Sequence, residues 1–283
     1  MLLGAHISAA GGLFNAPLNA KKMGCEIFQF FSRSPQGGKA SVITPEVLKL
    51  WNENLKLAKI KTCYIHTSYY INLASADNRL RHFSIAIIKE ELERASKLKV
   101  TAVMTHLGSD KGGDRNEAIK RVADSVAKIL TNYKGSAQFL FENSAGSGGV
   151  IGADFAELGK IIKLLPKPLQ TKVGICLDTC HAFASGYDFR TVEAVKKTVL
   201  AFKKHLGLKR LKLIHLNDSL KAFDSRVDRH ALLGKGLIGL KGMQAIFNNP
   251  DLKKINMIME TPGTDEERTN DLKTAFKLRK SKK

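Results

Sequence analysis

Residues 174–178 read GICLD, an apolar run that ends abruptly in a carboxylate, and five other runs of the chain end in a similar way. In chain order the six runs are CYIH (63–66), AVMTH (102–106), FLFEN (139–143), GICLD (174–178), LKLIH (211–215) and MIME (257–260). A strand that is covered on both faces has this apolar composition. The polar ends recur about every forty residues, a period that fits one strand plus one helix.

Two further runs, LLGAHIS at 2–8 and CEIFQFF at 25–31, bring the number of predicted strands to eight. The segments between the runs, such as 83–98 and 191–207, place apolar residues at helical intervals with charged residues between them. Eight strands that alternate with helices in 283 residues predict an α/β chain folded as a single-domain (β/α)8 TIM barrel. We expect this domain to cover residues 1–272, followed by a basic C-terminal tail at 273–283.

In such a barrel the active site lies at the carboxyl ends of the strands, so the polar ends of the runs should share one mouth. The six strand-end residues that can bind a metal are His66, His106, Glu142, Asp178, His215 and Glu260. Any one of them could instead cap a helix or bind a loop amide. Six potential ligands at a common period favour a metal site.

Two loops add potential ligands to the strand ends. His181 follows Asp178 closely, and Asp228 and His230 are two residues apart, so their side chains point the same way in an extended loop. Cys180 beside His181 allows a nucleophilic alternative, although catalytic partners usually come from separate segments. Together five histidines and four carboxylates are too many ligands for one ion and divide among three, with zinc or manganese suited to this mixture.

The charge balance points to an acidic partner. The chain has 46 basic and 26 acidic residues, a formal charge of +20, and its pI is about 9.8. Six basic residues of the tail (Lys273, Lys277, Arg279, Lys280, Lys282 and Lys283) account for part of this excess. Nucleic acid is the leading partner because phosphate neutralisation drives association with DNA, and a merely solvated lysine-rich surface is the alternative.

Cysteine usage and hydropathy suggest a compartment. The four cysteines lie in or beside the predicted strands and show no disulfide or CxxC spacing, which fits a reducing, cytoplasmic location. The start, MLLGAHISAAGG, is a poor signal peptide, and no stretch approaches eighteen apolar residues. We therefore expect no membrane partner.

Three long motifs carry a family resemblance: GAHISAAGG at 4–12, DTCHAFASGYD at 178–188 and HLNDSLKAFDSRVDRHALLGKGLIG at 215–239. They resemble the endonuclease IV family of zinc-dependent apurinic/apyrimidinic endonucleases. The resemblance extends through METP at 259–262 and leaves only the basic tail outside it.

The resemblance implies three zinc ions. The first would be bound by His66, His106 and Glu142, the second by Glu142, Asp178, His215 and Glu260, and the third by His181, Asp228 and His230. Glu142 would bridge two ions and orient a hydroxide that attacks the phosphorus on the 5′ side of an abasic sugar, leaving a 3′-hydroxyl and a 5′-deoxyribose phosphate. This chemistry implies a role in base excision repair on double-stranded DNA that contains abasic sites, and we expect a monomer.

Substrate recognition departs from the family pattern. Tyr69 matches a tyrosine that the family inserts into the damaged duplex, but Gln36 stands where an arginine is common. We expect Arg33 and Lys39 to contact phosphate in its place, with Arg229 also at the DNA interface. The resulting hypothesis is that lesion binding is weaker, or depends more on Tyr69, Tyr70 and the general positive charge.

Two other functions fit parts of the sequence. A sugar isomerase or epimerase of the same barrel superfamily also places His, Asp and Glu ligands at strand ends, and turnover of a ketose would identify it. A DNA-binding protein that has lost its chemistry would bind DNA tightly without incision. The full set of nine potential ligands and the charge of +20 favour the nuclease over both.

Overall fold

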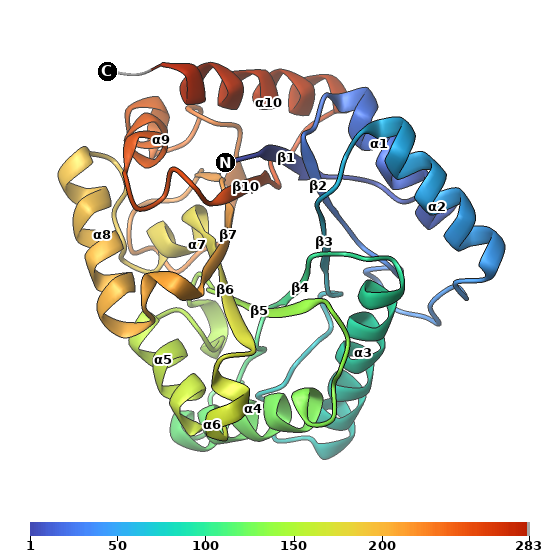
Figure 1. The fold of residues 1–283 in the computed structure, drawn as a ribbon. Coiled ribbons are helices and arrows are strands. Elements are labelled where there is room, and N and C mark those ends of the chain that lie inside the picture. The colour runs from blue at the N-terminus through green and yellow to red at the C-terminus, as the bar shows by residue number, and fades with distance from the viewer. Residues whose placement is uncertain (282–283) are drawn as a thin grey trace.

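The computed structural model describes residues 1–281 of the chain. Eight parallel strands close into a barrel, which confirms the predicted (β/α)8 fold (Figure 1). The strands are β1 (Leu3–His6), β2 (Ile27–Phe30), β3 (Cys63–His66), β4 (Ala102–Thr105), β5 (Gln138–Glu142), β6 (Val173–Asp178), β7 (Leu211–His215) and β10 (Asn256–Met259). They pair in chain order from β1 to β7, and β10 closes the ring between β7 and β1.

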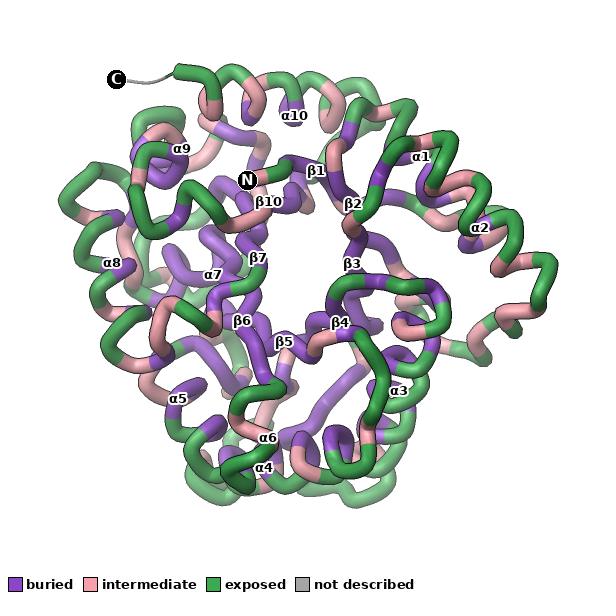
Figure 2. The backbone as a smooth tube through the Cα atoms, viewed as in Figure 1, coloured by how far each residue is buried: buried purple, intermediate pink, exposed green. Residues whose placement is uncertain are grey.

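Helices surround the barrel, and Figure 2 shows the buried strands at the centre with exposed segments on the outer helices. The α-helices are α1 (Ala16–Met23), α2 (Pro45–Ala58), α3 (Asn78–Lys97), α4 (Arg115–Leu130), α5 (Phe155–Leu164), α6 (Lys167–Gln170), α7 (Thr179–Ala184), α8 (Val192–His205), α9 (Gly239–Asn248) and α10 (Asp265–Lys280). Three short 3-10 helices are η1 (Leu13–Asn15), η2 (Ser147–Gly149) and η3 (Leu208–Arg210). Within the described residues, no helix has both the length and the apolar composition needed to cross a membrane.

The strands are apolar throughout because both of their faces are covered. One small buried cluster takes a residue from most strands: Ile27, Tyr64, Ala102, Met104, Leu140, Cys176, Leu213 and Ile258. Their neighbours in sequence, such as Phe28, Ile65 and Phe139, belong instead to the large core cluster that includes the helices. Since side chains alternate along a strand, the small cluster fills the barrel and the large one lies between barrel and helices.

Aspartates begin several helices at the carboxyl end of the barrel. Asp77 accepts a hydrogen bond from the backbone N–H of Arg79 at 2.7 Å and caps α3. Asp114 and Asp154 cap α4 and α5 in the same way. These carboxylates satisfy backbone donors at helix starts, so they belong to the scaffold of this end and not to its metal ligands.

The last helix corrects the expected domain boundary. Residue 272 lies inside α10, where Leu272 and Ala275 are buried, so residues 273–280 belong to the fold and not to a separate tail. Arg279 donates to Glu26 at 2.6 and 3.0 Å, and this ion pair fixes the end of the helix beside β1 and β2. Lys282 and Lys283, the last residues of the expected tail, lie outside the described residues.

Candidate metal centre

The polar strand ends converge on one cavity of about 460 Å³ at the carboxyl end of the barrel. Its lining includes His6, Phe31, His66, Tyr69, His106, His181, Asp228, Arg229, His230 and Glu260. These residues come from six strand ends and from the long connection after β7. The remaining predicted ligands, Glu142, Asp178 and His215, lie fully buried beneath the cavity.

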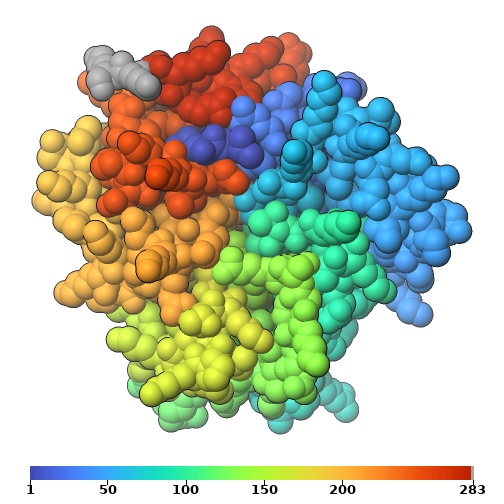
Figure 3. Space-filling model, in the orientation of Figure 1, coloured from blue at the N-terminus to red at the C-terminus, as the bar shows by residue number. Residues whose placement is uncertain are grey.

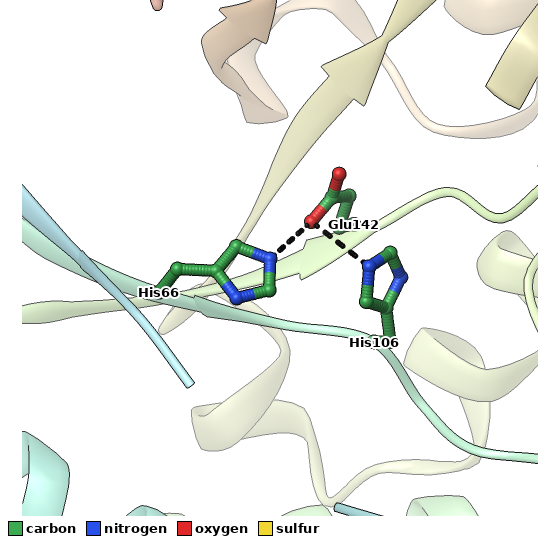
Figure 4. Close-up of side chains that lie close together, drawn as sticks. All are labelled: His66, His106 and Glu142. Atoms are coloured by element: carbon green, nitrogen blue, oxygen red, sulfur yellow. Dashed lines mark hydrogen bonds and ion pairs between the residues drawn. The ribbon is translucent and has the colours of Figure 1, made fainter. Parts of the chain in front are cut away.

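The first group joins three neighbouring strands. His66 at the end of β3 and His106 just after β4 both point to the carboxylate of Glu142 at the end of β5 (Figure 4). The Nε2 atoms of His66 and His106 lie 2.9 and 3.7 Å from the same oxygen, Oε2 of Glu142. Two imidazoles and one carboxylate at such spacings can share a divalent ion.

A second group lies on the other side of the same carboxylate. His215 Nδ1 lies 2.9 Å from Oε1 of Glu142 and 3.2 Å from Oε2 of Glu260. Asp178 completes the group, with its Oδ2 atom 3.9 Å from the same ring nitrogen. Glu142 therefore presents one oxygen to each group, an arrangement that allows one carboxylate to bridge two ions.

A third group depends on the long connection between β7 and α9. Its strands β8 (Asp218–Ser219) and β9 (His230–Ala231) form an antiparallel pair that folds Asp228 and His230 back over the barrel mouth. His181 Nε2 lies 3.1 Å from Asp228 Oδ2, and His230 Nε2 lies 3.3 Å from Asp228 Oδ1. Asp178 also reaches this group, because its Oδ2 atom lies 3.6 Å from His230 Nε2.

Hydrogen bonds at the second ring nitrogen fix four of the histidines. Nδ1 of His66 donates to the carbonyl of Thr67, Nδ1 of His181 to that of Asn143, and Nδ1 of His230 to that of Glu260; Nε2 of His215 donates to Oε1 of Gln29. Because a carbonyl oxygen only accepts, the other nitrogen of each ring has a free lone pair when the ring is neutral.

The free nitrogens all point into the ligand groups. The Nε2 atom of His230, for example, is buried and has no hydrogen-bond partner within residues 1–281. Histidine ligands of metal ions usually have their other ring nitrogen fixed by this kind of outer contact. The donor set therefore fits divalent ions of the zinc type.

Electrostatics favours the charged forms of His181, Asp228 and Glu142. Burial alone would lower the pKa of His181, but Asp178 and Asp228 outweigh it and raise this pKa to about 10. Burial would raise the pKa of Asp228, yet contact with His181 holds it at about 2. Desolvation opposes ionisation of Glu142, but His106 and other histidines keep its pKa well below the usual range. Binding of a cation must therefore displace a proton from His181, while Glu142 and Asp228 are already ionised.

Two residues of the site, Gln29 and His6, were not among the ligands predicted from the sequence. Gln29 on β2 donates to Glu260 Oε1 at 2.6 Å and accepts from His215, and its Nε2 atom lies 3.0 Å from Nδ1 of His6 on β1. Gln29 is fully buried within an apolar run. A polar residue inside the apolar run CEIFQFF was the available sign that Gln29 has polar partners at the site, since a buried amide requires hydrogen bonds.

The nucleophilic alternative for Cys180 is not supported by its surroundings. The side chain is buried, and burial followed by the charge of Asp178 raises the pKa of its thiol above the usual range. A thiolate, not a thiol, is the reactive form. His181 directs its ring toward Asp228 and the carbonyl of Asn143, so it does not act as a base for this thiol.

The predicted DNA contacts divide into two classes. Tyr69 is 71% exposed at the cavity rim, where its ring packs on Phe31 with centroids 5.4 Å apart. Gln36 and Arg229 are also exposed, and Arg229 lines the cavity. The expectation for Arg33 is wrong, as its side chain is only 3% exposed.

Arg33 has a structural role instead. Its Nε atom donates to Glu91 on α3 at 2.5 Å, and a second nitrogen lies 2.8 Å from Glu90. Ser32 donates to the same Glu91, and Arg94 binds the backbone of Ser32 at 2.8 Å. This buried network attaches the connection after β2 to α3, so the guanidinium is not available to a phosphate.

Comparisons with known proteins agree with the geometry. The family described as xylose isomerase-like TIM barrel matches residues 17–281. A probable endonuclease 4 of Halothermothrix orenii is 38% identical over 262 residues, which cover 93% of this chain and 94% of that protein. The crystal structure of endonuclease IV from Thermus thermophilus superposes with a TM-score of 0.86 at 32% identity, covering 98% of each chain. A D-tagatose 3-epimerase-like protein superposes with a TM-score of 0.72 at 18% identity over 99% of this chain and 98% of that one, a likeness of fold alone.

Proposed function

Since the chain belongs to the endonuclease IV family within the xylose isomerase-like TIM barrels, and is a metal-binding, DNA-cleaving hydrolase, we propose that it incises double-stranded DNA at abasic sites in base excision repair. The bond hydrolysed is the phosphodiester 5′ to the lesion, and the products are a 3′-hydroxyl and a 5′-deoxyribose phosphate. The observation that carries this proposal is the set of histidines whose lone pairs converge with buried carboxylates beneath an open cavity. The protein acts as a monomer.

We assign the nine ligands to three ions, which we propose to be zinc, with manganese able to replace it at one or more positions. The first position is formed by His66, His106 and Glu142, the second by Glu142, Asp178, His215 and Glu260, and the third by His181, Asp228 and His230. When bound, such ions lower the pKa of a shared water and withdraw negative charge from a phosphate. The overlap of Asp178 with the third group supports close spacing of the positions.

The residues of the chain prepare the site for an anionic substrate. Glu142 contacts His66 of the first position through one oxygen and His215 of the second position through the other, and so fixes these two rings relative to each other. Asp178 is fully buried, which keeps its carboxylate away from bulk water and strengthens its attraction for a cation. Asn217 donates to Oδ2 of Asp178 at 2.6 Å and so limits the rotation of that carboxylate.

Exposed residues around the cavity recognise the lesion. Tyr69 presents a flat aromatic surface beside the metal centre, suited to stacking against the bases that flank a missing one. Gln36 is exposed in the connection after β2 but carries no charge, and Arg229 presents a guanidinium at the cavity. We propose that Tyr69 and Arg229 provide more of the lesion contact than Gln36 does.

The direct experiment is incision of a duplex oligonucleotide that carries one abasic-site analogue. Cleavage immediately 5′ to the analogue, abolished by prolonged stripping with a chelator and restored by zinc, supports the proposal. The undamaged duplex is the control for specificity. A fully metal-loaded protein that leaves the damaged duplex intact would refute it, and turnover of a ketose by the same sample would transfer the assignment to the sugar epimerases that share the fold.

A further inference from the structure

Among the connections between strands and helices, the excess of positive charge lies at the end of the barrel opposite the metal centre. The connections that leave the strands at the carboxyl end carry eight basic and nine acidic residues. The connections that lead from a helix into the next strand, with α6 and η3 included, carry ten basic and two acidic residues. The ten are Lys59, Lys61, Lys99, Lys134, Lys167, Lys172, Lys209, Arg210, Lys253 and Lys254. We call the nine lysines of this set the lysine rim.

The lysine rim is accessible to a binding partner. All nine side chains are exposed, and none forms an ion pair within residues 1–281. Of the two acids at this end, Glu26 is already paired with Arg279 and only Asp251 is left. Figure 3 shows this side of the molecule, with the first residues of the chain in dark blue above its centre.

The distribution of the rim follows the barrel. Its lysines precede β3, β4, β5, β6, β7 and β10, which are consecutive around the closed sheet. Parallel strands begin at the same end of a barrel, so six adjacent connections bring their charges to one surface. Six of the eight barrel strands occupy three quarters of the closed ring, so the lysine rim curves around this end of the barrel as an arc. Duplex DNA carries one negative charge per roughly 1.7 Å, so a duplex that lies across this end presents several phosphates to the lysine rim at once.

Helix dipoles do not account for this excess. Each helix C-terminus contributes roughly half a negative charge at this end of the barrel. Basic residues in the last helical turns, such as Lys56, Lys128 and Lys203, already lie where they oppose those dipoles. The rim is additional to them, and it leaves this end strongly positive.

Two rim lysines occupy backbone positions that favour glycine. Lys59 directly follows the end of α2 and has a φ angle of 58°. Lys99 is the second residue after the end of α3 and has a φ angle of 56°. Glycine is the usual residue in this left-handed conformation at a helix end. Lys111 and Arg226 adopt the same conformation at the carboxyl end, so the conformation is compatible with the lysine rim but is not specific to it.

We propose that the lysine rim binds the phosphate backbone of a second duplex DNA segment while the metal centre occupies the first. The proposal concerns duplex binding only, and so it stands independently of incision at abasic sites. Lysine provides a point charge suited to phosphates in any sequence. A second contact of this kind allows the protein to pass between DNA segments without a fully unbound state.

Other polyanions fit the rim less well. Single-stranded nucleic acid is usually bound through exposed aromatic rings, but the only aromatic residue in these connections is Tyr133, whose hydroxyl contacts Ser96 and the carbonyl of Ala137. An anionic membrane surface would be bound more firmly with apolar anchors between the charges. The connections before β4 and β7 instead bury their leucines Leu98 and Leu206.

The test is a capture experiment with two duplexes. The protein is first bound to an immobilised duplex that carries an abasic-site analogue with a non-hydrolysable linkage on its 5′ side, and a fluorescent undamaged duplex is then added and its retention measured. The rim variant carries Lys61→Glu, Lys134→Glu, Lys209→Glu and Lys253→Glu. The matched control carries Lys49→Glu, Lys89→Glu, Lys196→Glu and Lys241→Glu, four exposed lysines on outer helices, so that both variants have the same net charge.

We expect the wild type and the control to capture the second duplex and the rim variant to capture at least about tenfold less of it. The salt dependence of binding to undamaged duplex should also weaken in the rim variant, by roughly 0.9 in log–log slope for each phosphate that it no longer neutralises. Equal reductions in both variants, or no second capture by the wild type, would overturn the proposal. So would binding of the rim to vesicles of phosphatidylcholine and phosphatidylglycerol at a salt concentration where no duplex is captured. A lysine-to-glutamine version of the rim variant replaces it if the glutamates prevent folding.

Discussion

At the carboxyl end of the barrel, charged groups such as Glu142 and His215 are buried and point toward one another, whereas at the amino end lysines such as Lys61 and Lys134 are exposed to water. The connections at the first end are nearly neutral, although this is the end that we assign to chemistry on DNA. The difference teaches that net charge does not locate an active site. Catalysis requires a few charges at fixed positions, whereas affinity for a polyanion requires many charges whose exact positions matter less.

The largest effect should come from the carboxylate shared by two ligand groups. Glu142→Gln keeps the size of the side chain but removes its charge, and we expect incision of the abasic duplex to fall by about 10³-fold or more, since metal assistance contributes several kcal/mol. Bound metal, measured by atomic emission, should fall with it. The control is Asp224→Asn, an exposed carboxylate of the same end that pairs with Arg226. Full activity and metal content in the Glu142 variant would remove this residue from the centre.

Arg33 tests whether a basic residue near the metal centre serves structure or DNA. Arg33→Met leaves Glu91 buried without its partner, so the free energy of unfolding should fall by about 3–5 kcal/mol in denaturant titrations. The salt dependence of DNA binding should not change. A phosphate contact predicts the reverse, with unchanged stability and a slope reduced by roughly 0.9. Lys39→Met, at an exposed position of the same connection, is the comparison.

Gln29 tests the outer contacts of the metal centre. Gln29→Leu removes its hydrogen bonds to His215 and Glu260, and we expect zinc affinity to weaken by about 10- to 100-fold. Competition with a fluorescent chelator measures this change. Gln138→Leu places the same substitution at the amino end of β5, where no ligand is affected. Equal zinc affinities in the two variants would contradict the role of Gln29.

The stability of the chelator-stripped protein should depend on pH through His181. Its pKa is raised to about 10 in the folded state, so its stabilising contribution is complete below the ordinary histidine pKa of about 6.5 and is lost as the pH rises toward 10. The pKa of Asp228 is lowered to about 2, so its contribution is lost only in acid, as the pH falls from about 3.9 toward 2. Thermal unfolding of wild type and His181→Asn between pH 6.5 and 10 measures the first effect. Parallel curves for the two proteins would contradict it.

The smallest effect concerns the backbone at the amino end. Lys59→Gly relieves a left-handed conformation, and we expect a gain of about 0.5–1 kcal/mol in the free energy of unfolding. The same change removes one charge of the lysine rim and should lower the salt slope for undamaged duplex by roughly 0.9. A stability gain without any change of slope would show that this lysine contacts no phosphate.

The period of the strand ends made the barrel and its mouth predictable. Each apolar run ends where its strand ends, so residues such as His66 and Asp178 could be placed at one end before the structure was known. The helix at the C-terminus was not recognised, because its buried positions Leu272 and Ala275 are scattered among many charges.

Contacts between elements were not predictable from the pattern. The burial of Arg33 depends on Glu90 and Glu91, which lie on a helix that begins more than forty residues later. The role of Gln29 depends on β10 and β7, which are far away in the chain. Such pairs depend on tertiary packing, which no local pattern encodes.

The most direct test of the metal centre is anomalous diffraction from zinc-loaded crystals at the zinc absorption edge. We predict three peaks beneath the cavity, one bound by His66, His106 and Glu142, one by Glu142, Asp178, His215 and Glu260, and one by His181, Asp228 and His230. A single peak, or peaks bound by other side chains, would contradict the assignment of this end of the barrel to metal-dependent chemistry on DNA.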